Sequence, residues 1–470
     1  MFTASRYRHR MTEATLADTT PIPRRRVFAW SLWDSASAGF NTVVVTFIFS
    51  TYLASNSFVS PAIVSAAGSD TANAALVAAK AHNATVVSTA LTIAGLLIAL
   101  LAPLLGQRSD GTGKRKLWLG ITTAIVILSM IGMVFVAPAH SYLVLGAMLI
   151  ALGSVVIEFA NVNYNAMLVQ VSTPANIGRV SSWGWSAGYF GGIVLLLLLL
   201  LLFIQSFGVT GHAGLLGLDS TIAGGVWTVR FAILASAVWF CLLAIPLFVS
   251  VPEIPATGKA AARLSFIQSY KQIGLTIARL YRKNPQVLLF LGASAIFRDG
   301  IAAVFTFGAI IAAQVFGFTT TQVLYFAVAA NVVAGVGAFL AGRFDDQLGA
   351  KTIIIVALIG LVVATVAILF VGNAQAGFWA CGLFLSLFVG PAQSASRSFA
   401  ARVAPPGREG EIFGLYATTG RAVSFLAPLL FTVFVTVTGN TRYGAIGIAV
   451  VLAVGLLLML RVNSEQRAID

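Results

Sequence analysis

Charged residues are scarce in this chain of 470 residues: Asp, Glu, Lys and Arg together make up 9%, against about 25% in soluble globular proteins. The sequence has only two cysteines, Cys241 and Cys381, each alone in an apolar stretch, which excludes a disulfide framework and a cysteine-based metal site. Hydrophobic residues instead reach 58%. This balance argues against a water-soluble enzyme and predicts an integral membrane protein.

The sequence also lacks a recognisable catalytic constellation. Its four histidines, His9, His82, His140 and His212, fall in the tail or in loops, and no nucleophile pattern accompanies them. A G-x-x-x-x-G-K-[ST] run is missing, which argues against ATP as the direct energy source. We therefore expect no enzymatic activity, no cofactor and no metal. Two alternatives stay open: a membrane-embedded lipid or glycan transferase, and a receptor or regulator on a transporter fold.

Twelve runs are apolar and long enough to cross a membrane, since a spanning helix needs about 20 mainly apolar residues. They cover 28–53, 84–105, 117–137, 141–165, 182–207, 225–251, 287–314, 321–342, 352–372, 375–396, 411–437 and 441–461. The runs are continuous rather than alternating, which disfavours a β-barrel. The sequence therefore predicts an all-α integral membrane fold with twelve transmembrane helices.

The formal net charge of +14 describes topology rather than a nucleic-acid partner. Lys and Arg concentrate in the N-terminal tail and in alternate loops, whereas the opposite loops hold only Lys80 and Arg442. Basic loops stay in the cytoplasm, so both termini are predicted to be cytoplasmic. A mitochondrial presequence is the competing interpretation of the Arg-rich tail, and Glu13 and Asp18 count against it.

A polar stretch at 252–286 separates six predicted helices from six. The predicted parts are a cytoplasmic tail at 1–26, an N-terminal six-helix bundle at 27–251, the linker at 252–286, a C-terminal six-helix bundle at 287–462 and a tail at 463–470. The linker combines basic and apolar residues, which predicts an amphipathic helix on the anionic inner leaflet.

Two loops repeat one pattern at a constant offset, which indicates internal symmetry. The first copy has Gly106, Asp110, Gly113, Arg115 and Lys116, and the second has Gly342, Asp346, Gly349 and Lys351. An aspartate at these positions can accept hydrogen bonds from the N-terminus of a facing helix or pair with an arginine, which would hold the cytoplasmic side closed. The alternative is a topology anchor that only keeps the loop inside.

The loop from Gly106 to Lys116 matches the G-x-x-x-D-x-x-G-x-R-[KR] signature of the major facilitator superfamily. Within that superfamily the chain resembles the fungal vacuolar amino-acid effluxers of autophagy and their bacterial relatives. The resembling stretches are Trp30–Phe40, Asn165–Leu168, Gly178–Gly192, Gln393–Ser398 and Phe413–Tyr416, the last followed by Gly420–Arg421. The resemblance implies two pseudo-symmetric six-helix bundles, solute transport, amino acids as a candidate substrate class and a monomer. The Ser-Ala-Ser run at 35–37 departs from these relatives, which more often have a Trp-Ala-Asn-like run.

Two polar triads share the spacing i, i+3, i+7, which places each triad on one helix face. The first is Asp34, Ser37 and Asn41, and the second is Glu158, Asn161 and Asn165. Ionisable residues inside a membrane mark functional sites by default, so both triads are candidates for a substrate or proton site. The alternatives are a carboxylate paired with an arginine at Asp34 and a polar helix–helix contact at Glu158.

Arginines inside the predicted helices are the remaining candidates. Arg298 and Asp299 are adjacent and point about 100° apart on a helix, so we expect at most one of them to face the cavity. Arg421 can clamp a substrate carboxylate or serve as the counter-ion of Asp299 or Asp34. Arg397 is expected at the cytoplasmic end of the tenth helix, where it can snorkel towards the surface.

These patterns predict a secondary active transporter that moves a small solute by alternating access between the two bundles. Proton coupling follows from the intramembrane carboxylates, and export of an amino acid or metabolite follows from the resemblance. The expected partners are a small-molecule substrate, membrane lipid and protons, with no nucleic acid. We expect a multi-pass protein of the cell membrane if the chain is bacterial.

Overall fold

The structure is a computed structural model that describes residues 22–70, 72–199, 201–202, 226–253 and 265–463. Both predicted tails lie largely outside these residues, as does the part of the predicted linker at 254–264. Within the described chain the regular structure is helical, and twelve helices are long and apolar enough to span a membrane. The predicted fold class and helix count are therefore confirmed. The assignment of both termini to the cytoplasm stays a prediction.

The first bundle begins with two long membrane spans, of 30 and 39 residues. Its helices are α2 (Arg24–Ala38), a π-helical continuation (Gly39–Phe49), α3 (Ser50–Leu53), α4 (Pro61–Ala67), α5 (Ala74–Thr112), α6 (Arg115–Val134), α7 (Leu143–Ala166), α8 (Leu168–Val171), α9 (Ile177–Leu199) and α10 (Val226–Ser250). The π-helical spacing was not predicted. Two side-chain hydroxyl groups follow the same five-residue spacing. The Thr46 hydroxyl donates to the Asn41 carbonyl at 3.0 Å, and the Ser50 hydroxyl donates to the Val45 carbonyl at 2.5 Å.

The second span begins at Ala74, earlier than the predicted start at 84. The side-chain oxygen of Asn73 caps this start because it accepts the backbone N–H groups of Ala75 and Leu76. The sequence that follows is rich in alanine, which favours helix even outside the apolar run. The connection between the predicted runs 28–53 and 84–105 is therefore shorter than those bounds imply, and it contains α4.

The second bundle follows a helix that is not a membrane span. Its helices are α12 (Pro285–Phe316), α13 (Thr320–Leu348), α14 (Ala350–Phe370), α15 (Gln375–Val403), α16 (Glu409–Val423), α17 (Leu426–Thr438) and α18 (Gly444–Arg461), and α11 (Phe266–Lys283) precedes them. The predicted eleventh run at 411–437 is one span broken between α16 and α17. Pro428 contributes to this break because a proline cannot donate the backbone hydrogen bond that would tie α17 to α16.

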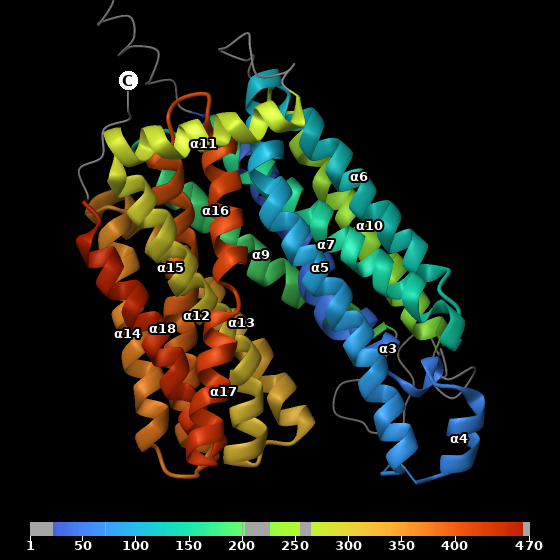
Figure 1. The fold of residues 1–470 in the computed structure, drawn as a ribbon. Helices are drawn as coiled ribbons and strands as arrows, with labels where there is room; N and C mark the ends of the chain where they lie inside the picture. Colours follow the sequence, from blue (N-terminus) through green and yellow to red (C-terminus); the bar gives the residue numbers. More distant parts are fainter. Residues whose placement is uncertain (1–21, 71, 200, 203–225, 254–264, 464–470) are drawn as a thin grey trace, which may run out of the picture.

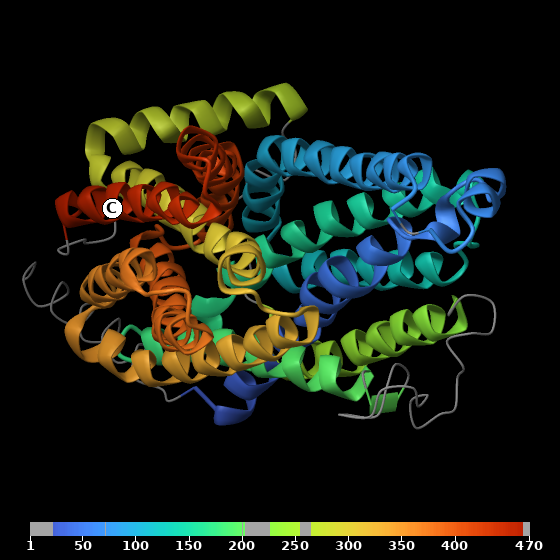
Figure 2. The ribbon, with the colours of Figure 1, turned by 90° about the horizontal axis from the view of Figure 1, so that it is seen from below.

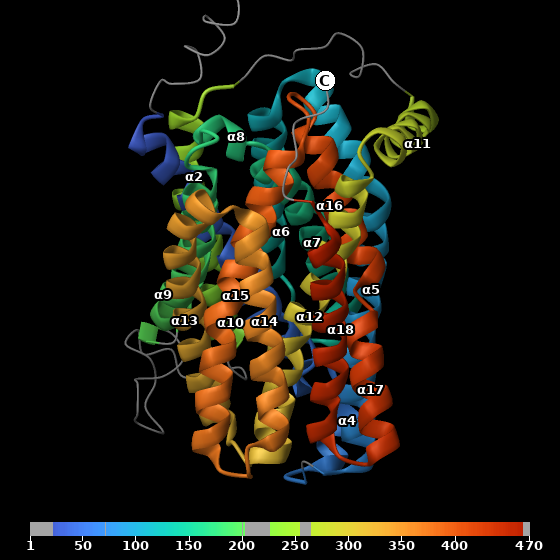
Figure 3. The ribbon, with the colours of Figure 1, turned by 90° about the vertical axis from the view of Figure 1, so that its left-hand side faces the viewer.

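The two bundles lie side by side and approach each other closely at the end where α11 lies (Figures 1 and 2). Helix α5 packs against α16 and α9 packs against α13 across this boundary. The loops that carry the repeated glycine-aspartate pattern lie at this same end, which we call the motif end. Figure 3 shows α11 projecting beside the bundles at the motif end.

Candidate functional site: a polar cavity between the bundles

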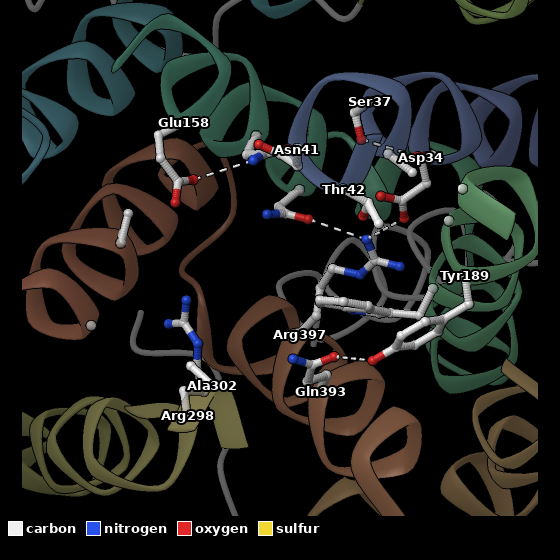
Figure 4. A pocket seen from close by; sticks show the side chains of 18 of the residues that line it. Asp34, Ser37, Asn41, Thr42, Glu158, Tyr189, Arg298, Ala302, Gln393 and Arg397 are labelled. Carbon is white, nitrogen blue, oxygen red and sulfur yellow. Dashed lines mark hydrogen bonds and ion pairs between the residues drawn. The ribbon is translucent and has the colours of Figure 1, made fainter. Parts of the chain in front are cut away.

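A cavity of about 440 Å³ lies between the two bundles and receives side chains from both. It is lined by all nine residues that the sequence predicts for a substrate or proton site: Asp34, Ser37, Asn41, Glu158, Asn161, Asn165, Arg298, Asp299 and Arg421. Trp185, Tyr189, Gln393 and Arg397 also line it. Both polar triads thus face the same space from the first bundle, one from α2 and its π-helical continuation and the other from α7 (Figure 4).

Arg397 joins the bundles through Asp34. Its Nη1 lies 2.9 Å from Oδ2 of Asp34 and 3.3 Å from Oδ1 of Asn165, and its Nε donates to Oγ of Ser181 at 3.1 Å. The guanidinium also lies 4.9 Å from the ring centre of Trp30. Only 4% of the Arg397 side chain is exposed, so this arginine is fully engaged inside the protein.

The prediction that Arg397 snorkels at a helix end is therefore wrong. Hydropathy falls after 396, but α15 continues to Val403 through small residues such as Ser398 and Ala400, so Arg397 lies inside the helix. A signal was present in the sequence, because Gln393 and Arg397 are four residues apart and share a helix face. Gln393 accepts a hydrogen bond of 2.6 Å from the Tyr189 hydroxyl (Figure 4).

Arg421 pairs with Glu158, not with either aspartate named in the prediction. Its Nη2 lies 2.9 Å from Oε1 of Glu158, whose other oxygen accepts a 3.2 Å hydrogen bond from Asn161. The two aspartates are engaged elsewhere, because Asp34 holds Arg397 and Asp299 holds a backbone N–H group. This second ion pair also joins the two bundles, from α16 to α7.

Arg298 and Asp299 both line the cavity, contrary to the prediction that at most one would. The cavity contacts two faces of α12, so neighbouring side chains that diverge can both border it. Asp299 accepts the backbone N–H of Ala427 at 2.7 Å, at the start of α17 where the eleventh span is broken. A carboxylate is favoured there by the positive end of the helix dipole.

The guanidinium of Arg298 is placed differently from those of Arg397 and Arg421. It lies 3.8 Å above the ring centre of Tyr416, and its Nη1 donates to the Tyr416 carbonyl at 3.0 Å. Among the described residues no carboxylate lies within ion-pair distance of it. Figure 4 shows this side chain reaching from α12 towards the cavity.

The motif end is closed by two contacts of the same kind. Asp110 accepts the backbone N–H groups of Gly410 and Glu411 at 3.0 and 2.8 Å, which are the second and third residues of α16. These N–H groups have no partner within the helix, so the carboxylate satisfies them. Arg115 holds Asp110 at 2.6 Å and reaches Glu409 across the boundary at 2.5 Å.

The second copy makes the mirrored contact. Asp346 accepts the N–H groups of Gly178 and Arg179 at 2.8 and 3.3 Å, again the second and third residues of a helix, here α9. Arg402 holds the adjacent Asp345 at 2.5 Å. The structure therefore places Asp110 and Asp346 in equivalent positions, each at the helix N-terminus of the opposite bundle.

The other residues of the two loops have local roles. Gly113 and Gly349 end α5 and α13 with φ of 63° and 83°, a backbone region that suits glycine. Lys116 donates to the carbonyls of Phe248 and Val251 at the end of α10, and Lys351 donates to that of Leu460 at the end of α18. Each lysine thus neutralises the negative end of the last span of its own bundle. Gly106 and Gly342 lie where α5 meets α16 and where α13 meets α9.

Two six-helix bundles around a central polar cavity, joined by paired helix-terminus contacts, define the fold of the major facilitator superfamily. The structure is similar to that of the proton:xylose symporter XylE, with a TM-score of 0.68, 12% identity and coverage of 94% of this chain and 96% of that one. It is also similar to the human organic anion transporter MFSD10, with a TM-score of 0.65, 14% identity and coverage of 94% and 100%.

Residues 170–470 match the family model described as vacuole effluxer Atg22 like, and the chain belongs to this family. It is 24% identical over 438 residues to an uncharacterized MFS-type transporter, YxiO, of Bacillus subtilis strain 168, covering 93% of this chain and 94% of the relative. It is 26% identical over 306 residues to autophagy-related protein 22 of Cryptococcus neoformans, covering 61% of this chain and 53% of that protein. The match thus spans about half the length of this fungal relative. The protein is a major facilitator superfamily transporter related to Atg22, which confirms the resemblance seen in the sequence.

Proposed function

We propose that the protein is a secondary active transporter that moves a small carboxylate-bearing solute, with amino acids as the first class to test, by alternating access. The observation that carries the proposal is the asymmetry among the cavity arginines. Arg397 and Arg421 each have a carboxylate partner within the protein, whereas the Arg298 guanidinium borders the cavity without one. A buried or half-buried guanidinium binds carboxylates bidentately, so Arg298 is the group left for the solute.

The size and polarity of the cavity support a small, polar solute. A volume of about 440 Å³ lies at the lower end of the range for small-molecule sites. Amide and hydroxyl groups of Asn41, Asn161 and Ser37 line it and offer both donors and acceptors. The family description as an effluxer makes export the first direction to test.

Alternating access is supported by where the bundles are tied together. The contacts of Asp110 and Asp346 lie at the motif end, and the Ser181–Ser394 and Arg397–Ser181 bonds lie between them and the cavity. With the motif end in the cytoplasm, this is the outward-facing state of a transporter. The predicted parts 27–251 and 287–462 would then move as two bodies about the cavity, with 252–286 as the linker.

Replacing Arg298 tests the proposed substrate site. A thermal-shift screen of the purified protein against amino acids, other carboxylates and amines first identifies a ligand. We expect Arg298→Gln to weaken its binding by about tenfold to a hundredfold, because hydrogen bonds to a charged group contribute about 1.5–3 kcal/mol. Arg298→Lys should recover only part of the loss, since an ammonium lacks the planar fork.

The matched control is Arg343→Gln, which removes an exposed arginine outside the cavity. Isothermal titration of the three variants should show full affinity for the control. If Arg298→Gln binds the ligand as tightly as the unaltered protein, or if only compounds without a carboxylate bind, the proposed site is wrong.

Proton coupling is the second part of the proposal, and the three cavity carboxylates are its candidates. Asp34 and Glu158 are each held by an arginine, whereas Asp299 is held by a backbone N–H group alone among the described residues. We therefore expect Asp299→Asn to abolish the stimulation of transport by a pH gradient in proteoliposomes, while exchange of solute at equal pH continues. Asp34→Asn and Glu158→Gln are measured beside it. Gradient-driven transport that survives all three substitutions would rule out this coupling.

A further inference from the structure

Helix α11 lies across the motif end at the edge of the molecule, where the two bundles meet (Figures 1, 2 and 3). One face of it is buried against the protein. Its residues are Ser269, Ile273, Thr276 and Leu280, which are 1%, 5%, 3% and 3% exposed. Their spacing of three and four residues defines one stripe of a helix, so the rest of the helix surface is directed away from the bundles.

This helix is bonded to both bundles at once. The hydroxyl of Tyr270 donates to the carbonyl of Leu100 in α5 at 2.6 Å. On the other side, Arg408 donates to the hydroxyl of Thr276 at 2.7 Å and pairs with Glu411 at 2.6 Å. Glu411 is one of the two residues whose N–H groups bind Asp110, so α11 is linked through Arg408 to the contact that closes the motif end.

The outer surface of α11 is divided into an apolar side and a basic side. Ile267, Ile277 and Tyr281 are spaced to share one side and are 78%, 40% and 72% exposed. Four exposed cations, Lys271, Arg279, Arg282 and Lys283, lie on the remaining side around one exposed leucine, Leu275, and the helix contains no acidic residue. A helix with this division lies flat in a membrane interface, its apolar side towards the acyl chains and its cations among the headgroups.

We propose that α11 is a docking surface for anionic phospholipid of the leaflet at the motif end, and that this docking favours the state in which the motif end is closed. Charge complementarity selects the occupant, because four exposed cations on a helix that contains no acidic residue attract an anionic leaflet. The hydrogen bond from Tyr270 also places α11 beside Leu100 of α5, an exposed residue of a membrane span.

The coupling follows from the two bonds that α11 makes. When α5 and α16 separate at the motif end, α11 cannot keep both Leu100 and Arg408 as partners. A leaflet that holds α11 flat against the molecule therefore stabilises the closed arrangement over the open one. This second half of the proposal rests on alternating access, whereas lipid docking itself does not.

Docking is tested by lipid retention. The purified protein, reconstituted in nanodiscs of phosphatidylcholine with phosphatidylglycerol, is released into detergent and examined by native mass spectrometry. We expect the variant Lys271→Gln/Arg279→Gln/Arg282→Gln/Lys283→Gln to retain phosphatidylglycerol at least about threefold less than the unaltered protein. The matched control, Arg24→Gln/Arg25→Gln/Arg343→Gln/Arg461→Gln, removes four exposed cations elsewhere and should retain it normally. Equal retention by the two variants would overturn the docking surface.

Coupling is tested by the accessibility of a buried position at the motif end. Ser182 is fully buried and bonded to Ser394 of the opposite bundle at 3.1 Å, so Ser182→Cys reports separation of the bundles once Cys241 and Cys381 are replaced by serine. We expect phosphatidylglycerol to slow its labelling by a maleimide at least about threefold, and inorganic phosphate to have no effect.

The slowing by phosphatidylglycerol should vanish in Thr276→Val, which retains the cations and loses the bond to Arg408. A lipid effect that survives Thr276→Val, or that phosphate reproduces, would overturn the coupling, and labelling that is absent under every condition would instead count against alternating access.

Discussion

Replacing Arg397 with glutamine is expected to lower the free energy of unfolding by on the order of 3–5 kcal/mol, because it leaves the Asp34 carboxylate buried without a counter-ion. The pair is 2.9 Å apart, and the two side chains are 4% and 18% exposed, so solvent does little to screen the lost charge. Asp34→Asn should lower the free energy of unfolding by a comparable amount, because it leaves the Arg397 guanidinium buried without a counter-ion. Denaturation of each purified variant in mixed micelles, followed by tryptophan fluorescence, measures the loss.

The double variant Asp34→Asn/Arg397→Gln separates the ion pair from the packing around it. It leaves no uncompensated charge, so its loss of stability should be well below the sum of the two single losses. The difference is the coupling energy of the pair. Additive losses would show that Arg397 stabilises the protein through Ser181 and Trp30 instead, and that Asp34 is free for another partner.

The surroundings of Asp34 also show how much of the site can be predicted from the sequence. Helical spacing places Asp34, Ser37 and Asn41 on one face, and the cost of charge in lipid turns that face towards a cavity. Both inferences need only local geometry, and the cavity does contain all three residues, although Asn41 lies in the π-helical segment that the sequence did not predict.

The partners of the charged residues could not be predicted in the same way. Arg397 is 363 positions from Asp34, and Arg421 is 263 positions from Glu158. Each pairing depends on how two bundles are oriented, which no local pattern encodes. The type of partner could be predicted for the aspartates of the repeated loops. The backbone N–H groups at a helix N-terminus bind a nearby carboxylate, even when the sequence does not show which helix lies there.

The closed motif end has a further consequence for substrate access. Asp34–Arg397 and Glu158–Arg421 both cross between the bundles, so they would have to lengthen or break when the cavity changes sides. A solute that binds Arg298 would sit beside these pairs and compete for their charges. Under the proposed alternating access, the ion pairs inside the cavity would therefore belong to the same moving interface as the helix-terminus contacts at Asp110 and Asp346.

A single methyl group at Gly106 is expected to open the motif end. The Cβ of an alanine there would overlap the backbone carbonyl of Gly410, and a backbone atom cannot move aside unless α5 and α16 separate. Separation breaks the hydrogen bonds from α16 to Asp110, which are worth about 1.5–3 kcal/mol each because the acceptor is charged. Loss of one bond is enough to raise the population of the open state by about tenfold.

Labelling of Ser182→Cys measures this shift, and Gly95→Ala is its control. Gly95 lies in the same helix, and a Cβ there meets no atom within 4 Å, so both substitutions carry the same gain in helix propensity but only one carries the clash. We expect the maleimide rate to rise at least about tenfold with Gly106→Ala and to stay unchanged with Gly95→Ala. Equal rates in the two variants would mean that the contact at Asp110 does not close the motif end, and the loop would then serve only to anchor the topology.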